Sequence, residues 1–226
     1  MREIIEFISL LHQNNSKEWF DVHRAQWKHI QTQFAAFGEG LIDGISSFDP
    51  SVKGLSVKDC TFRINRDIRF SNNKEPYKNH IGIYIAPHGK KAGYAGYYFH
   101  IEPKGNGLLG NSLLSAGLYM PEPVVLRSIR DEIFDNGAEI AKAISDAKGF
   151  VLVEENKLKR TPVGYAAGSE FDELLKLKDL YLEKRISEEF LLDDRLLTRT
   201  LAEFRKTMPL VAILNRAVQF AHEEMM

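Results

Sequence analysis

The sequence has very little cysteine and no long run of apolar residues. Cys60 is the single cysteine among 226 residues, which excludes intramolecular disulfides and any zinc site built from several cysteines. No stretch approaches the roughly 20 apolar residues of a membrane-spanning helix. The first 15 residues also lack the apolar core and the cleavage site of a signal peptide. We therefore expect a cytoplasmic protein with no membrane partner.

An excess of either charge is also missing, and so are the common catalytic motifs. Lysine and arginine number 30, aspartate and glutamate 31, and the formal net charge is −1. This balance argues against a general nucleic-acid coat protein, which is usually basic throughout. The sequence contains no H-E-x-x-H, C-x-x-C, G-x-S-x-G or Walker sequence. We expect no metal ion and no cofactor, and these patterns indicate neither a reaction nor an oligomeric state.

The composition is that of an ordinary globular protein, with 44% hydrophobic and 27% charged residues. A chain of this length fits one large domain or two small ones. It contains no internal repeat, low-complexity tract or linker-like segment. We expect a single domain over residues 1–226, although a subdomain boundary near residue 148 is compatible with the sequence.

Helical periodicity marks the N-terminal part of the chain. Residues 2–12 have the pattern of a short amphipathic helix. Ser16 is a favourable N-cap for a long second helix, with Glu18 in its first turn, and Asp49-Pro50 ends that helix. The following side chains of this second helix recur every three or four residues, which predicts one buried face: Phe20, His23, Trp27, Ile30, Phe34, Phe37, Leu41 and Ile45.

Strand patterns follow, over residues 81–86, 94–102 and 109–119. The first two strands form a hairpin, and each has its apolar residues at odd positions. If both apolar sets face the core, the paired residue numbers must add up to an even sum, because a slip of one residue would turn one set to water. A sum of 180 would place His80 opposite His100. The other face of these strands would then carry histidines, tyrosines and glycines, including Tyr84 and Tyr98.

The second half alternates helices and strands. We expect helices over 122–135, 137–147 and near 170–176, a hairpin of 150–154 with 157–160, and a strand near 180–186. Residues 187–224 are predicted to be helical, with Pro209 either starting a new helix or kinking the old one. The predicted fold class is α+β: an antiparallel β-meander with helices packed on its apolar face.

Residues 58–80 are the most informative stretch, because they carry a charge of +3 in a chain whose net charge is −1. Cationic side chains this close together repel one another, and an anion or buried carboxylates would relieve that repulsion. Residues 60–70 alternate like a half-buried strand. Arg66 is out of step, so either the strand breaks or bulges at 65–67, or Arg66 is buried against a carboxylate.

If this strand lies beside the strand at 81–86, its cations join the face that carries His80, Tyr84, Tyr98 and His100. Guanidinium groups bind oxyanions through two hydrogen bonds, and tyrosine and histidine add further donors. We therefore predict a pocket for an anionic, phosphate- or carboxylate-bearing small molecule. Its expected ligand-binding residues are Arg63, Arg66, Arg69, Lys74, Lys78 and Tyr84, with Asp67 orienting an arginine. If the protein is an enzyme, His80, His100 and Tyr98 are the catalytic candidates.

Three other interpretations stay open. The same cations could contact the phosphates of a nucleic acid, which would make binding strongly salt-dependent. The arginines could instead form a structural ion-pair network in a non-catalytic interaction protein, because such networks imitate active sites. A metal held by the histidines with Glu102 or Asp67 is the least favoured, because the spacing is not diagnostic.

Several blocks of the chain resemble one known family. They are Asn14-Asn15-x-Lys17-Glu18-Trp19-Phe20, Phe62-Arg63-Ile64-x-Arg66-Asp67-x-Arg69-Phe70-Ser71, Lys74-x-Pro76-Tyr77-Lys78-x-His80 and Gly96-Tyr97-Tyr98-x-His100-Ile101. With these blocks the chain resembles the domain of unknown function 2461 family, which consists of uncharacterised bacterial and fungal proteins. The resemblance covers nearly the whole chain and implies one domain. It carries no activity over to this protein.

Overall fold

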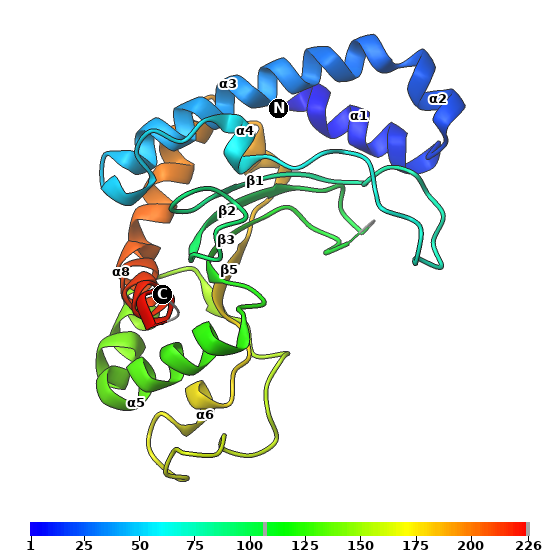
Figure 1. Ribbon diagram of the computed structural model, residues 1–226. Helices are drawn as coiled ribbons and strands as arrows, with labels where there is room; N and C mark the ends of the chain where they lie inside the picture. The colour runs from blue at the N-terminus through cyan, green and yellow to red at the C-terminus, as the bar shows by residue number, and fades with distance from the viewer. Residues whose placement is uncertain (106–107, 225–226) are drawn as a thin grey trace.

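A five-stranded antiparallel sheet with helices packed against it forms the described part of the chain, which is residues 1–105 and 108–224 of a computed structural model (Figure 1). The strands are β1 (Ile81–Ile85), β2 (Gly96–Ile101), β3 (Leu113–Leu118), β4 (Val151–Leu152) and β5 (Leu180–Arg185), in the spatial order β1-β2-β3-β5-β4. β1, β2 and β3 form a meander. The predicted α+β class is confirmed.

The helices gather on one side of the sheet. α3 (Arg24–Ser46) runs along the top in Figure 1, and α5 (Pro123–Asp146) and α8 (Leu196–Glu224) lie on the left, with α8 against β3. α1 (Arg2–Gln13) and α2 (Lys17–Val22) pack on α3, and short helical turns fill the connections. Those turns are η1 (Pro50–Val52), α4 (Val57–Cys60), α6 (Asp172–Leu175) and α7 (Glu188–Leu191). None of the helices in the described residues is long and apolar enough to cross a membrane.

The predicted long second helix is interrupted. Ser16 caps α2 as expected, with its hydroxyl accepting from the backbone N–H of Trp19 at 3.2 Å. The helix then breaks at His23, whose imidazole lies 2.8 Å from the carbonyl oxygen of Trp19 and stacks on the Trp19 ring. This side-chain contact competes with regular helical geometry. The chain therefore turns a corner between α2 and α3.

The predicted strand parity is confirmed, but the register differs by two. The odd-numbered apolar residues of β1 and β2 are all buried, with Tyr97, Phe99 and Ile101 fully so. The pairs add up to 182, which places Gly82 opposite His100. Sums of 180 and 182 bury the same side chains, so burial does not distinguish them and the connection between the strands decides.

The predicted Arg-rich strand is wrong. Its first residue ends α4, and the rest is an irregular loop that pairs with residues 76–78 over a few residues only. The backbone N–H of Arg66 donates to Pro76 and that of Lys78 donates to Ile64, both at 2.9 Å. The pairing ends at Arg66, the residue that is out of step with the alternation. Phe70, which has the apolar parity of that alternation, is 95% exposed.

The second half differs from prediction mainly at its edge strand. The hairpin of 150–154 with 157–160 is wrong, because Val151–Leu152 pairs with β5 as the edge of the sheet. The two helices expected on either side of residue 136 form one kinked helix, α5, in which Asn136 has non-helical φ and ψ of −128° and 28°. α8 continues through Pro209.

Candidate functional site

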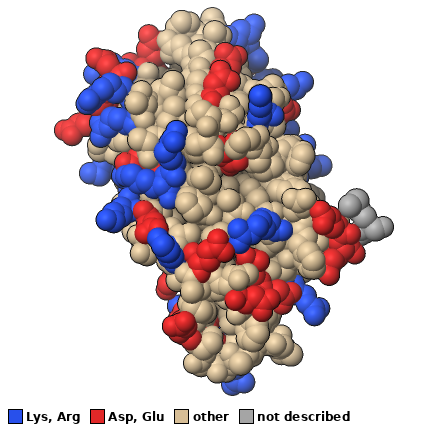
Figure 2. Space-filling model, turned by 90° about the vertical axis from the view of Figure 1, so that its left-hand side faces the viewer, with Lys and Arg blue, Asp and Glu red and all other residues tan. Residues whose placement is uncertain are grey.

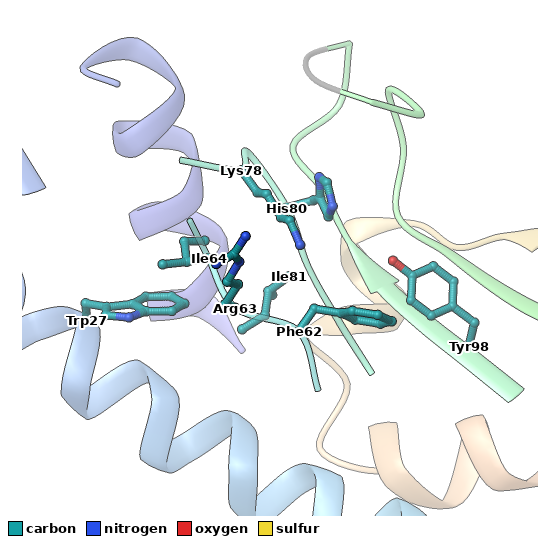
Figure 3. A pocket seen from close by; sticks show the side chains of 9 residues that line it. Trp27, Phe62, Arg63, Ile64, Lys78, His80, Ile81 and Tyr98 are labelled. Carbon is teal, nitrogen blue, oxygen red and sulfur yellow. The ribbon is translucent and has the colours of Figure 1, made fainter. Parts of the chain in front are cut away.

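A cavity of about 170 Å³ lies where the loop at residues 62–64 meets the start of β1 and the middle of β2. In Figure 3 the side chains of Arg63 and Lys78 end beside each other in this space, and the hydroxyl of Tyr98 points toward it from β2. The cavity is lined by Trp27, Phe62, Arg63, Ile64, Lys78, His80, Ile81, Gly82 and Tyr98.

Arg63 and Lys78 are the cations of the cavity. Burial and the neighbouring charge of Arg63 lower the pKa of the Lys78 ammonium. Its Nζ lies 5.4 Å from the ring centroid of Phe62, a cation–π distance. Within residues 1–105 and 108–224, no carboxylate forms an ion pair with either cation, whereas Arg66 and Arg69 both have carboxylate partners. The cavity therefore has two adjacent cations without a direct carboxylate partner.

The corner between α1 and α2 holds the segment that carries Lys78 and His80. The side-chain amide of Asn15 donates to the carbonyl of Tyr77 at 2.9 Å and to Oδ1 of Asn79 at 2.8 Å. Its own Oδ1 accepts from the backbone N–H of Tyr77 at 3.1 Å. The Tyr77 ring stacks on Phe20 with 4.0 Å between centroids. Helix packing thus positions a loop that has little regular structure of its own.

A chain of hydrogen bonds runs from the cavity into the protein through Tyr98, His100 and Glu102. The Tyr98 hydroxyl lies 2.9 Å from Nδ1 of His100, and Nε2 of His100 lies 3.0 Å from Oε2 of Glu102. His100 is fully buried and Glu102 is 4% exposed. An ionised carboxylate can only accept, so Nε2 donates to Glu102, and a neutral imidazole at this position accepts from the Tyr98 hydroxyl at Nδ1.

Glu102 is held in its ionised form. Burial raises the pKa of its carboxyl, but hydrogen bonds from His100 and from the backbone N–H groups of Leu109 and Leu108 outweigh this and lower it. The N–H groups of Leu109 and Gly110 donate to Oε2 at 2.8 and 3.1 Å. The end of the hydrogen-bonded chain is therefore a fixed negative charge.

His80 lies beside this chain, with its ring centroid 4.9 Å from that of His100. Burial and then the proximity of His100 lower the pKa of His80 to about 4. At neutral pH its ring is therefore neutral, and it can donate one hydrogen bond and accept another.

A larger groove of about 610 Å³ lies next to the cavity, over the face of the sheet opposite the helices. Tyr98 and Phe62 line both spaces, so they form the boundary between them. The groove has aromatic walls from Tyr84, Tyr94, Tyr98, Tyr119 and Tyr181 and carboxylates from Glu155, Asp179 and Glu183. Burial and the proximity of Glu155 raise the pKa of Glu183.

The predicted site residues divide into two groups. His80, His100 and Tyr98 come together as expected, and Arg63 and Lys78 join them at the cavity. Tyr84 lines the groove, but its hydroxyl donates to the backbone carbonyls of Tyr94 and Gly117 at 2.7 and 3.2 Å.

The second group lies on the loop outside the cavity. Arg69 pairs with Asp67 at 2.6 Å, and both are exposed. Lys74 donates to the carbonyl of Ile68 at 3.1 Å. Arg66 donates to the carbonyl of Glu75 and to the hydroxyl of Ser71, at 3.1 and 3.3 Å, and so closes the loop on itself. Neither cavity nor groove is lined by any of these four residues.

Sequence reasoning missed three contributors. Glu102 enters the prediction only as a metal ligand. It lies two residues after His100, however, and residues two apart on a strand share one face, so the sequence does indicate their contact. Phe62 has the apolar parity of the predicted strand at 60–70, yet it lines both spaces. Asn15 is a clamp whose partners lie more than 60 positions away, a separation that no local pattern reveals.

Among the described residues, no group of three histidine, cysteine, aspartate or glutamate side chains is arranged to hold a metal ion. In comparisons with known proteins, a family model described as "Conserved hypothetical protein (DUF2461)" matches residues 3–212. No curated protein and no solved structure matches the chain.

Proposed function

This chain belongs to the DUF2461 family, and we propose that it is a single-domain cytoplasmic protein that binds a small organic anion in the cavity between Arg63 and Lys78. The observation that carries this proposal is the pair of adjacent cations without a carboxylate partner among the described residues. Burial and the charge of Arg63 already lower the pKa of Lys78. A bound anion would relieve this repulsion and accept hydrogen bonds from both side chains.

The size of the cavity indicates which part of the ligand it takes. Pockets for whole small molecules usually measure about 300–1,000 Å³, and this cavity measures about 170 Å³. It therefore fits a carboxylate or phosphate group, with the remainder of the ligand in the groove beyond Tyr98 and Phe62. Neutral His80 also lines the cavity and can donate one further hydrogen bond to the anion.

Thermal unfolding in the presence of sulfate, phosphate, sugar phosphates and small carboxylates tests the proposal. A ligand at 100 times its Kd stabilises by about 2.7 kcal/mol, which corresponds to roughly 5–10 °C at this chain length. Arg63→Gln/Lys78→Gln should abolish the shift. The matched control is Arg69→Gln/Lys74→Gln, which removes two cations of the same segment that do not line the cavity. Equal shifts in both double variants would refute the site.

Nucleic acid is a second candidate, supported by a different observation. Phe70 is 95% exposed, and the Arg69 guanidinium lies 5.8 Å from its ring centroid. An exposed aromatic ring beside cations can stack on an unpaired base. The face shown in Figure 2, on the side of α5 and α8, carries Lys and Arg interspersed with Asp and Glu, so that face is not an extended basic surface. Affinity that falls steeply with salt and depends on Phe70 would favour this candidate.

A further inference from the structure

We infer from the geometry that Tyr98 is a catalytic acid–base, which moves a proton on the carbon next to the carboxylate of a hydroxylated organic acid. This inference rests on the proposed anion site and goes beyond binding. Anion binding alone gives the hydrogen-bonded chain of Tyr98, His100 and Glu102 no role, whereas proton transfer does.

The accessibility of the three groups determines their roles. His100 is fully buried and Glu102 nearly so, so neither can touch a ligand. Tyr98 lines both the cavity and the groove, and its hydroxyl is directed to Nδ1 of His100 at 2.9 Å. A ligand that spans the two spaces must pass Tyr98. Tyr98 is therefore the residue that contacts the ligand. His100 and Glu102, which lie behind it, position its hydroxyl and accept its proton.

The proton movement balances without any co-reactant. The substrate C–H proton passes to the Tyr98 oxygen while the Tyr98 hydroxyl proton passes to Nδ1 of His100. The resulting imidazolium is paired with the Glu102 carboxylate at 3.0 Å, and the electron pair of the C–H bond moves into the substrate carboxylate as an enediolate. Reversal returns a proton to that carbon. The logic matches a serine–histidine–aspartate triad, in which the buried histidine takes the hydroxyl proton and the acid stabilises its charge.

The cations and the groove determine the class of substrate. Arg63 and Lys78 would stabilise the extra negative charge of an enediolate, because cations placed beside the atoms where negative charge develops lower the energy of that charge. A phosphate ester does not make the adjacent C–H acidic in this way, whereas a carboxylate does. The groove offers carboxylates and tyrosine rings, which suit a body rich in hydroxyl groups. These features together favour a sugar acid.

Burial also explains why Tyr98 acts through His100. Burial and the nearby charge of Glu102 raise the pKa of the Tyr98 hydroxyl, so a free tyrosinate does not accumulate at neutral pH. A concerted transfer avoids that state, because the phenol gains one proton as it loses another. General acid–base catalysis of this type contributes about 10²–10⁴-fold in rate.

Hydrogen exchange in D₂O tests the inference without knowledge of the product. D-galacturonate, D-glucuronate and D-gluconate are the probes, and NMR follows both binding and the loss of the proton next to the carboxylate. The expected result is that the wild type binds at least one probe and exchanges this proton. Tyr98→Phe should bind the same probe with exchange slower by about 100-fold or more. Glu102→Gln, which keeps the shape, should slow exchange and change its pH profile.

The outcomes separate the two proposals. Absence of binding by every anion tried would remove the anion site and this inference with it. A probe that binds through Arg63 and Lys78 but does not exchange would overturn the catalytic role and leave the anion site standing. Exchange at the wild-type rate in a folded Tyr98→Phe variant would also overturn it.

Discussion

A Cβ atom on Gly82 would lie 2.6 Å from the hydroxyl oxygen of Tyr98. Gly82 faces His100 across the β1–β2 ladder, so the missing side chain leaves the space through which the Tyr98 ring reaches over β1. The contact between Tyr98 and His100 therefore depends on Gly82, although Gly82 has no side chain that could touch either of them.

Gly82→Ala should displace the Tyr98 ring and break its hydrogen bond to His100. The overlap is with the ring as well as the hydroxyl, and overpacking of this kind typically costs about 1–3 kcal/mol of unfolding free energy. Urea unfolding checks the cost. Tyr98→Ala should relieve the overlap, so the double variant should be more stable than the sum of the two single effects implies. Simple additivity would show that the space at Gly82 is not reserved for Tyr98.

His80 should make the protein less stable as the pH falls from about 6.5 to about 4. Its pKa in the folded state is lowered to about 4 by burial and by His100, whereas an unperturbed histidine titrates near 6.5. Between these values the unfolded chain binds a proton that the folded protein does not, so stability rises with pH and is lost on acidification. The contribution reaches up to about 3 kcal/mol. His80→Gln should lose less stability over this range in chemical unfolding.

A bound anion should raise the pKa of His80, which burial and His100 lower in the protein without ligand. Negative charge in the cavity favours protonated His80, so anion affinity should increase as the pH falls toward 5. Sulfate is the suitable probe, because its own charge is constant over this range. Calorimetry at pH 7 and pH 5 should give tighter binding at pH 5 in the wild type and a smaller change in His80→Gln. An equal change in both proteins would mean that His80 does not face the ligand.

The parts of the fold that follow a local period could be predicted, and the parts decided by distant contacts could not. The alternation in β1 and β2 places Ile83 and Phe99 in the core in any even register, which is why parity is correct although the sum is not. The segment around Arg66 alternates as a strand does, yet few backbone partners are available to it beyond residue 66. Beyond that residue, Asp67 and Arg69 are exposed and pair with each other, and neither lines the cavity.

The residues of the site also divide into those that a local period predicts and those that only distant contacts bring together. Tyr98, His100 and Glu102 project from one face of β2 at a spacing of two, so their proximity is a consequence of strand geometry. Arg63 and Lys78 come together only through the irregular pairing of Lys78 with Ile64. Charge alone did not separate them from Arg69, whose partner Asp67 is two residues away.

Cys60 should be unreactive in the folded protein. Its side chain is fully buried, and burial, with a smaller effect of Asp59, raises the pKa of the thiol to about 11. The thiolate is the reactive form, so both access and ionisation are suppressed. At pH 8 a disulfide reagent should label the native protein slowly and the urea-unfolded protein at once. Fast labelling under native conditions would show that the α4 region opens readily.

Asn15→Ala should loosen the segment that carries Lys78 and His80. The substitution removes three hydrogen bonds to residues 77–79 and leaves partly buried backbone groups without their partner, a change that costs about 1–3 kcal/mol. Anion affinity should fall as well, because an ordered segment no longer positions Lys78. The matched control is Asn14→Ala, whose exposed amide bonds within its own helix, to Leu10. If Asn15→Ala and Asn14→Ala lower stability and affinity equally, the clamp does not organise the cavity.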